Sequence, residues 1–453
     1  MKAPRSDDLM IPPDGARPSV DASRVRVTEI PMGPENITTC DIALGDLDGD
    51  GLEEIATVLT AGEDDSVRAY RGTGELLWEN TDVRLYHAFY GDRERSRVPH
   101  MWYRIRHRHV LTKALDWDGD GSPEVLVGDG PVYVLDGETG RTLQTIDLKG
   151  SVPLWTVAVD ESSGPLLIAT VDRKAEGGHL VAVRPDGSTA WSQPLPGQAF
   201  CDCMLAGALG PEGRTVVGFS IEDVRLFRIV DLAGKTWWEL NVREDLGEDD
   251  HVDDFIFAPV LPETKENQIA SGTGPALIGG DGKVLWSLRD LIDHGQAARA
   301  GNFLPDVPGM QLFFVDSLVG RTYLTSAFGQ VLWTYQNYSR VRPDLKDKAL
   351  HRLSNKVDVI HWSAPDRDEI VLGEIVRLRE DRLPEGLMTL YVTVLDGEGR
   401  VVDRLPFQDA PGPGALGFVG DMTVTGAHVT DGATDDIVVV THNSSTMFIY
   451  SRV

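Results

Sequence analysis

The sequence predicts an all-β protein, an eight-bladed β-propeller, with a seven-bladed propeller as the alternative. Three observations favour this fold: a glycine turn followed by apolar residues recurs along the chain, the copies are regularly spaced, and short strand-like runs precede each turn. Four short antiparallel strands repeated radially form a β-propeller. Of the 453 residues, 41% are hydrophobic and 25% are charged, which is ordinary for a folded domain.

The repeat is clearest at its turn, where glycine precedes a short apolar run that often ends in tryptophan. Examples are GTGELLW at 72–78 and GDGKVLW at 280–286. Glycine tolerates the left-handed backbone that such turns need, so each copy predicts the connection from the third to the outer fourth strand of a blade. The aligned turn glycines are Gly74, Gly140, Gly187, Gly234, Gly282, Gly329 and Gly399, at intervals of 66, 47, 47, 48, 47 and 70 residues.

The two ends of the chain predict one shared blade. Residues 436–450 match strands of the first unit, but the chain stops before another glycine turn. Residues 24–30 (RVRVTEI) alternate in the manner of a strand, so we expect them to supply the missing outer strand and close the ring. The predicted organisation is a flexible segment over residues 1–23 and a single propeller domain over residues 24–453, with insertions near 79–109 and 334–356.

Charge and hydropathy argue against several functions. Acidic residues outnumber basic ones 71 to 43, for a formal net charge of −28. Such a surface repels nucleic acid and anionic lipid, so neither is an expected partner. We also expect a monomer. No apolar run approaches the roughly 20 residues of a spanning helix. Without a secretory signal pattern, we expect a cytoplasmic protein if this N-terminus is native and a secreted one if a leader was removed.

Cysteine usage predicts no disulfide framework, because there are only three cysteines. Cys201 and Cys203 lie two residues apart and would face the same side of a strand. We expect buried core thiols, with a metal or redox pair as the alternative.

Two acidic loops predict calcium sites at equivalent places in the first two blades. DLDGDGLEE spans 46–54 and DWDGDGSPE spans 116–124. Alternate aspartates can surround a hard cation, glycine permits the tight turn, and the later glutamate closes the shell. A metal-free Asx turn is the alternative, and a structural cation is expected rather than a catalytic one. The predicted Ca²⁺ ligands are Asp46, Asp48, Asp50, Glu54, Asp116, Asp118, Asp120 and Glu124.

Basic residues concentrate in two insertions, on the predicted face opposite the acidic loops. Residues 84–109 carry seven arginines against Asp92 and Glu94, for a net charge of +5, and residues 340–356 carry +4. A third basic loop at 376–386 should reach the same face. We expect this patch to bind an anionic, uronate-containing saccharide. Ion pairing with acidic neighbours is the structural alternative.

The order of these motifs resembles a known enzyme family. A turn with LLW, an insertion with histidines, DxDGDGxxEV and YVLDGETGRTL follow one another as in the rhamnogalacturonan lyases, eight-bladed polysaccharide lyases with FG-GAP-like calcium repeats. Residues 294–316 (HGQAARAGNFLPDVPGMQLFFVD) also resemble the family form HGDALHxGDxxPDxPGLEVF, although a substrate-side histidine and most cation ligands are replaced. The departures are Gln296, Arg299, Asn302 and Gln311.

The resemblance implies a lyase that cleaves a rhamnogalacturonan-like, ulvan-like or rhamnose-glucuronate glycan by β-elimination, with Ca²⁺ as its cofactor. Elimination removes the C5 proton of a uronate, so it needs a cation beside the carboxylate and a histidine or tyrosine as base. Residues 103–109 contain all of these groups. The predicted catalytic residues are His107, His109, Tyr103 and Arg104, and the predicted substrate-binding residues are Arg106, His87, His100, Arg299, Arg340, Arg342 and Arg377.

Two other functions remain open at this stage. One is a non-catalytic, calcium-stabilised propeller scaffold or sugar-binding module, whose basic face recognises an anionic partner without chemistry. The other is a quinone-cofactor dehydrogenase, because DGKVLW and LAGKTWW resemble the tryptophan-docking motifs of eight-bladed quinoproteins. The sequence has no adjacent-cysteine pair, which argues against the dehydrogenase.

Overall fold

The computed structural model describes most of the chain. The described residues are 21, 23–33, 37–61, 64–84, 112–128, 130–160, 164–173, 177–197, 203–247, 251–292, 294–316, 321–336, 349–378, 390–407, 422–441 and 446–453. The segment predicted over residues 1–23, and most of the insertions predicted near 79–109 and 334–356, lie outside these ranges. Their predicted properties therefore stay predictions.

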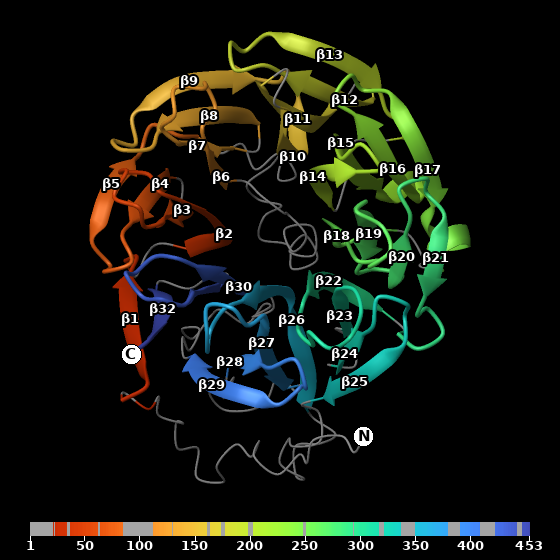
Figure 1. Ribbon diagram of the computed structural model, residues 1–453. Helices are drawn as coiled ribbons and strands as arrows, with labels where there is room; N and C mark the ends of the chain where they lie inside the picture. Colours follow the sequence, from red (N-terminus) through yellow and green to blue (C-terminus); the bar gives the residue numbers. More distant parts are fainter. Residues whose placement is uncertain are drawn as a thin grey trace. The chain divides into compact units, whose positions relative to one another are not determined.

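Within these ranges, thirty-two strands form eight four-stranded antiparallel sheets, the blades of an eight-bladed β-propeller (Figure 1). The predicted fold class is confirmed, and eight blades replace the seven-bladed alternative. Two short helices, η5 (Glu222–Val224) and η6 (Val242–Leu246), accompany the strands. None of the helices in the described ranges has the length and apolar character needed to cross a membrane.

The chain divides into two compact units. The unit containing residues 41–259 and 264–289 carries blades 1 to 5, apart from residues 37–40 at the start of β2. Blade 1 contains β2 (Ile37–Gly45), β3 (Glu54–Ala61), β4 (Asp64–Tyr70) and β5 (Leu76–Asn80). Blade 2 contains β6 (Thr112–Leu115), β7 (Glu124–Val127), β8 (Pro131–Asp136) and β9 (Thr142–Asp147). Blade 3 contains β10 (Ser151–Asp160), β11 (Gly164–Asp172), β12 (Gly178–Val183) and β13 (Thr189–Pro194). Blade 4 contains β14 (Met204–Leu209), β15 (Arg214–Ile221), β16 (Leu226–Asp231) and β17 (Thr236–Asn241). Blade 5 contains β18 (Phe255–Ala258), β19 (Gln268–Ser271), β20 (Ala276–Ile278) and β21 (Val284–Ser287).

The other unit carries blades 6 to 8 and includes residues 290–453. Blade 6 contains β22 (Gly295–Gly301), β23 (Gln311–Asp316), β24 (Arg321–Thr325) and β25 (Val331–Gln336). Blade 7 contains β26 (Ala349–Ile360), β27 (Glu369–Leu378), β28 (Leu390–Leu395) and β29 (Val401–Phe407). Blade 8 contains β30 (Met422–Ala427), β31 (Asp436–Thr441), β32 (Thr446–Arg452) and the N-terminal β1 (Val25–Pro31).

The N-terminal strand completes blade 8, as predicted. β1 pairs antiparallel with β32 along its whole length, from Val25 opposite Arg452 to Pro31 opposite Thr446. Strand β1 therefore supplies the outer strand that the C-terminal end of the chain lacks, and β32 is not left as an open edge.

Inner and outer strands differ in their pattern of burial, which explains why some are continuously apolar in sequence and others alternate. The second strand of a blade is covered on both faces, so β7 and β23 are buried throughout. The outer strand is covered on one face only, and β9 alternates between exposed and less exposed positions. Hydrophobic clusters fill the space between consecutive blades within each unit; between blades 2 and 3, for example, Val132, Trp155 and Leu167 are fully buried. Cys203 is also buried, which confirms one of the two predicted core thiols, whereas Cys201 lies outside the described residues.

The seven turn glycines lie where they were predicted, between the third and fourth strands of blades 1 to 7. Each adopts a positive φ, from 68° at Gly140 to 88° at Gly74. A residue with a Cβ is strained in this backbone region, which explains why glycine recurs there.

Candidate functional site

Both predicted acidic loops connect the first strand of a blade to the second. The loop of residues 46–53 joins β2 to β3, and the loop of residues 116–123 joins β6 to β7. Their four glycines, Gly49, Gly51, Gly119 and Gly121, all have a positive φ, and a Cβ at any of them would contact nothing within 4 Å. These glycines are therefore needed for backbone conformation alone, and the two loops share one folded form.

The first loop gathers three carboxylates. One oxygen from each of Asp46, Asp48 and Asp50 lies within 4.8 Å of the others. Loop backbone groups fix all three. Gly51 N donates to Asp46 Oδ2 at 3.1 Å, Asp50 N to Asp48 Oδ1 at 3.2 Å and Leu52 N to Asp50 Oδ1 at 2.8 Å. The other oxygen of Asp46, Oδ1, is buried and has no hydrogen-bond partner among the described residues. An uncompensated carboxylate oxygen of this kind fits a cation ligand.

The second loop repeats this network with a different convergent set. Asp116, Asp118 and Glu124 bring one oxygen each within 4.8 Å of the others. Gly121 N donates to Asp116 Oδ2 at 3.1 Å, and Ser122 N donates to Asp120 Oδ1 at 2.8 Å. Six of the eight predicted ligands belong to these two sets, which do not include Glu54 and Asp120. Hard carboxylate oxygens are the donors that Ca²⁺ prefers.

The loop glutamates have a structural role that the sequence analysis did not predict. Glu54 Oε2 accepts the backbone N–H of Leu47 at 2.8 Å, and Glu124 Oε2 accepts that of Trp117 at 2.8 Å. Burial, reinforced by neighbouring aspartates, raises the pKa of both carboxyls, and the backbone hydrogen bonds oppose the shift. Each glutamate therefore braces its loop from the second strand, and Glu124 also brings one oxygen within 4.8 Å of oxygens of Asp116 and Asp118.

Other blades keep this brace where the acidic loop has decayed. Gln311 Oε1 accepts Leu304 N at 2.7 Å, and Asp436 Oδ2 accepts Thr430 N at 2.8 Å. The family departure at Gln311 therefore preserves the loop's support. The brace explains why an acidic or amide residue begins the second strand even in a loop that lacks the aspartate series.

An arginine lies against the first loop. Arg71 Nε donates to Asp48 Oδ2 at 3.0 Å, and Arg71 Nη1 lies 3.1 Å from Glu75 Oε2. The equivalent position in blade 2 is Asp136, because Tyr70 pairs with Ile55 as Leu135 pairs with Val125. The two loops are therefore alike in backbone but opposite in the charge beside them.

In blades 7 and 8, a histidine lies among the carboxylates of the decayed loops. His361 Nε2 lies 3.2 Å from Asp368 Oδ1, and His361 Nδ1 lies 3.2 Å from Asp435 Oδ2. Asp435 also accepts the backbone N–H of His361 at 2.7 Å. The imidazole of His361 therefore lies between carboxylates of two decayed loops.

Tryptophans on the outer strands dock onto the turn of the following blade. In each case the indole Nε1 donates to a backbone carbonyl of that turn, which ties neighbouring blades together. A Cβ on the turn glycine Gly140 would lie 2.4 Å from the Trp78 ring, so the docked indole requires a glycine there. The docked pairs are Trp78 with Gly137 at 2.6 Å, Trp191 with Leu232 at 2.7 Å, Trp238 with Gly280 at 2.9 Å and Trp333 with Gly397 at 2.8 Å.

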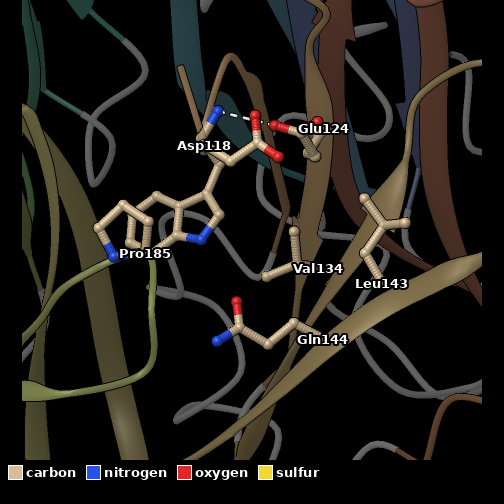
Figure 2. A pocket seen from close by; sticks show the side chains of 7 residues that line it. Asp118, Glu124, Val134, Leu143, Gln144 and Pro185 are labelled. Carbon is tan, nitrogen blue, oxygen red and sulfur yellow. Dashed lines mark hydrogen bonds between the residues drawn. The ribbon is translucent and has the colours of Figure 1, made fainter. Parts of the chain in front are cut away.

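A cavity of about 270 Å³ borders the second acidic loop. Figure 2 shows Asp118 and Glu124 on one side of it and Gln144 on the opposite side. Its other lining residues are Trp117, Val134, Leu143 and Pro185. The sequence analysis did not identify this cavity.

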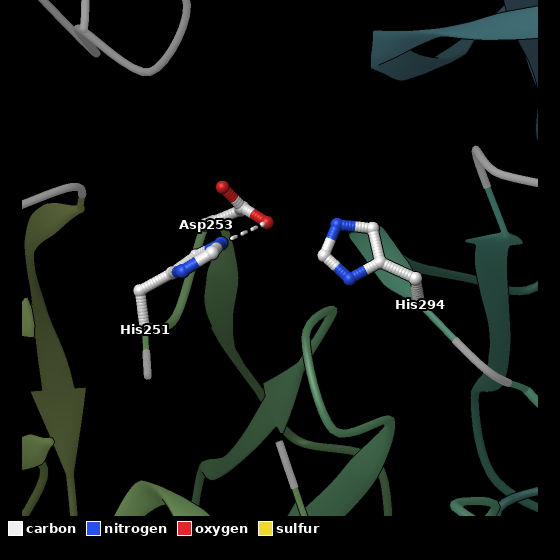
Figure 3. Close-up of side chains that lie close together, drawn as sticks. All are labelled: His251, Asp253 and His294. Carbon is white, nitrogen blue, oxygen red and sulfur yellow. Dashed lines mark ion pairs between the residues drawn. The ribbon is translucent and has the colours of Figure 1, made fainter. Parts of the chain in front are cut away.

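A buried histidine–aspartate pair was also missed. His251 Nε2 lies 3.3 Å from Asp253 Oδ2, and their side chains are 7% and 2% exposed (Figure 3). Thr273 supports the aspartate, because its Oγ1 accepts Asp253 N at 2.8 Å. The HVDD run at 251–254, directly before β18, is the sequence signal that could have identified the pair.

Most of the predicted catalytic and substrate-binding residues lie outside the described residues. These are His107, His109, Tyr103, Arg104, Arg106, His87, His100, Arg340 and Arg342. Arg377 is described only as part of β27, where it pairs with Leu350. Arg299 lies on β22 and donates from Nη1 to the carbonyl of Ala298 at 2.6 Å. Their roles toward a substrate stay predictions.

Comparison with known proteins supports the fold. No family model matches the chain, and no curated protein matches it. Among solved structures, Sqt1 of Saccharomyces cerevisiae is 11% identical, with a TM-score of 0.57 over 95% of this chain and 99% of that one. BamB of Moraxella catarrhalis is 13% identical, with a TM-score of 0.46 over 94% and 97%. Virginiamycin B lyase of Staphylococcus aureus is 8% identical, with a TM-score of 0.43 over 95% and 100%. At these identities, the likeness concerns the propeller fold alone.

Proposed function

We propose that this protein is a calcium-stabilised β-propeller scaffold. One observation carries the proposal: the same strand connection in two consecutive blades gathers three carboxylates within 4.8 Å of one another. Asp46, Asp48 and Asp50 would hold one ion, and Asp116, Asp118 and Glu124 the other. A bound Ca²⁺ supplies charge neutralisation and links the first strand of a blade to the second.

The geometry of the loops supports a structural role for the ion. The ligands are fixed by backbone N–H groups within the loop, and Glu54 and Glu124 brace the loop from the second strand. Removing the ion leaves several like charges close together in each loop, which destabilises the folded state.

Thermal melting with and without calcium tests the proposal. Calcium that binds only the folded state should raise the melting temperature, with a gain of about 2.7 kcal/mol at a hundred times the Kd. The double variant Asp48→Ala, Asp118→Ala should lose this shift. The matched control is Asp186→Ala, Asp281→Ala, which removes two aspartates from turns elsewhere and should keep it. An equal melting temperature in calcium and in chelator would contradict the proposal.

A uronate lyase remains our second proposal, motivated by the net charge of +5 on residues 84–109 in a chain of net charge −28. Tyr103 or one of the predicted histidines would act as base, and Arg104 would neutralise the carboxylate of the saccharide. Absorbance of the unsaturated product, followed on a panel of uronate polysaccharides, tests this proposal. Product that forms with the parent chain but not with His107→Ala or His109→Ala would support this proposal. If no polymer yields product, only the scaffold proposal stands.

A further inference from the structure

Three blades lack the docking tryptophan on their outer strand: blades 2 and 7, and blade 8, whose outer strand is the N-terminal β1. Strand pairing aligns the residues that follow the bulge beside each turn. In blades 1 and 3 to 6 these are Trp78, Trp191, Trp238, Trp286 and Trp333. In blade 2 the equivalent residue is Gln144, opposite Val134, and in blade 7 it is Asp403, opposite Val394.

Blades 2 and 7 carry a tryptophan in the loop before their second strand instead. Trp117 lies seven residues before Glu124, and Trp362 lies seven residues before Glu369. In blade 7 the replacement is complete, because Trp362 Nε1 donates to Asp403 Oδ2 at 2.8 Å. Blade 7 is therefore an internal reference for what a loop tryptophan does when it has a partner.

Blade 2 lacks this hydrogen bond. Gln144 reaches toward the turn of blade 3, since its Nε2 lies 3.0 Å from the place a Cβ of Gly187 would occupy. Trp117 is 1% exposed, and its Nε1 has no hydrogen-bond partner among the described residues. The cavity of about 270 Å³ lies between Trp117 and Gln144, where other blades hold a docked indole. The site therefore has space and a buried donor without an acceptor.

The lining defines the ligand's chemistry. Trp117 Nε1 needs an acceptor, whereas Asp118 and Glu124 need donors and repel an anion. The amide of Gln144 can donate and accept. Val134, Leu143 and Pro185 provide an apolar wall, and Leu143 is 43% exposed at the opening. A ring with hydroxyls around its edge and C–H groups on its faces satisfies all of these demands.

The volume sets the size of that ring. Pockets for drug-sized ligands begin at about 300 Å³, so this cavity accommodates a single six-membered ring with its substituents. We propose that the cavity between Trp117 and Gln144 is a binding site for one neutral pyranose. This site shares Asp118 and Glu124 with the proposed second calcium site, so its ligand is tested in chelator, where both carboxylates can accept from hydroxyls. It goes beyond the proposed scaffold, because it depends on the missing indole.

A tryptophan side chain of a partner protein is the rival occupant, because it would restore the docking seen in other blades. Its indole N–H would donate to the turn of blade 3, at Pro185. It offers no acceptor, so Trp117 Nε1 would stay unpaired. The donor inventory therefore favours the sugar.

Fluorine NMR on protein labelled with 5-fluorotryptophan tests the site. The chain has ten tryptophans, and Trp117→Phe assigns the resonance of interest. Methyl glucoside, methyl galactoside and methyl mannoside are titrated separately in chelator, with glucuronate as the anionic comparison and N-acetyltryptophanamide as the rival. We expect a saturable shift of the Trp117 resonance with at least one neutral glycoside and weaker binding of glucuronate.

Two variants separate the site from a general effect on folding. Gln144→Trp restores the docked indole, so it should fill the cavity, abolish glycoside binding and raise the melting temperature. Trp117→Phe keeps an aromatic ring but removes the indole N–H donor. It should weaken glycoside binding, measured by calorimetric titration, roughly tenfold. The control Trp191→Phe removes a paired indole N–H from another blade and should leave binding unchanged.

Three results would overturn the proposal. They are a Trp117 resonance that none of the neutral glycosides moves, glycoside binding that persists in Gln144→Trp, and binding of glucuronate or N-acetyltryptophanamide that is tighter than that of every neutral glycoside. Each outcome is read on protein whose melting curve shows that the variant is folded.

Discussion

Trp362 and Asp403 join the loop of blade 7 to its outer strand, through a hydrogen bond of 2.8 Å from the indole Nε1 to Oδ2. The same carboxylate receives Arg24, whose Nη2 lies 3.2 Å from Oδ1. Arg24 directly precedes β1, the strand that completes blade 8. Asp403 therefore connects two consecutive blades at the place where the N-terminal strand joins the C-terminal end of the chain.

Replacing Asp403 separates the two interactions. Asp403→Ala leaves the fully buried indole N–H of Trp362 without its acceptor and should lower the free energy of unfolding by about 1–3 kcal/mol. Asp403→Asn keeps an acceptor and loses only the ion pair with a half-exposed arginine, so it should cost about 1 kcal/mol or less. Urea denaturation measures both. Equal costs would mean that the stability depends on the charge of Asp403 and not on the buried hydrogen bond.

The docked indoles predict that replacing a turn glycine costs more stability where an indole packs against it. Gly140 and Gly164 have similar φ values, 68° and 71°, but a Cβ on Gly140 would meet the Trp78 ring, whereas one on Gly164 would meet nothing within 4 Å. Gly164→Ala should cost about 1–2 kcal/mol, from backbone strain alone. Gly140→Ala should cost roughly 1–3 kcal/mol more, because the blade interface must also open. If the two variants have the same melting temperature, the docked indole does not constrain the turn.

The architecture could be predicted from sequence because it depends on local signals. Turn glycines, the alternating N-terminal run and the two aspartate series each act within a few residues, and each lies where it was predicted. The contacts that modify the acidic loops could not be predicted. Arg71 reaches Asp48 across 23 residues of sequence, through the pairing of three strands.

The sequence contains one sign of the cavity, a missing tryptophan on the outer strand of blade 2. It becomes clear only when the strands of the blades are aligned. In blade 2 the apolar run after the turn is TLQ at 142–144 instead of ending in tryptophan. A missing tryptophan alone does not predict a cavity, since blade 7 also lacks one and fills the position with Trp362 and Asp403. The outcome depends on how a loop tryptophan packs, which is a property of tertiary structure.

Arg71 yields a prediction about the cation loops. Its guanidinium would compete with the proposed ion for Asp48. Arg71→Ala should therefore raise the calcium affinity of the first loop by roughly two- to fivefold, the value of a partly exposed ion pair. Isothermal titration should use an Asp118→Ala background, in which the second loop is disabled. Arg214→Ala, which removes an exposed arginine paired with Glu212, is the control and should change nothing. An unchanged or weaker affinity in Arg71→Ala would show that Asp48 does not bind the ion through this oxygen.

Lys113 makes stability depend on pH in the alkaline range. It lies on β6, its Nζ donates to Thr156 Oγ1 at 3.2 Å, and burial lowers the pKa of its ammonium group. Below the lowered folded pKa the amine is charged in both states, so the folded protein bears the full cost of burying it. As pH rises past the lowered folded pKa toward the ordinary value of 10.5, the folded state has lost the proton that the unfolded state still holds.

The contribution of Lys113 to the free energy of unfolding therefore rises with pH across this window. Lys113→Met should melt at a higher temperature than the parent near neutral pH, and this difference should shrink as pH rises into the window. Lys149→Met, at a side chain that is 77% exposed, is the matched control and should follow the parent at every pH. Melting curves recorded from neutral to alkaline pH check the prediction. If the gap between Lys113→Met and the parent is constant across that range, the amine is not titrating at a lowered pKa, and its burial carries no pH-dependent cost.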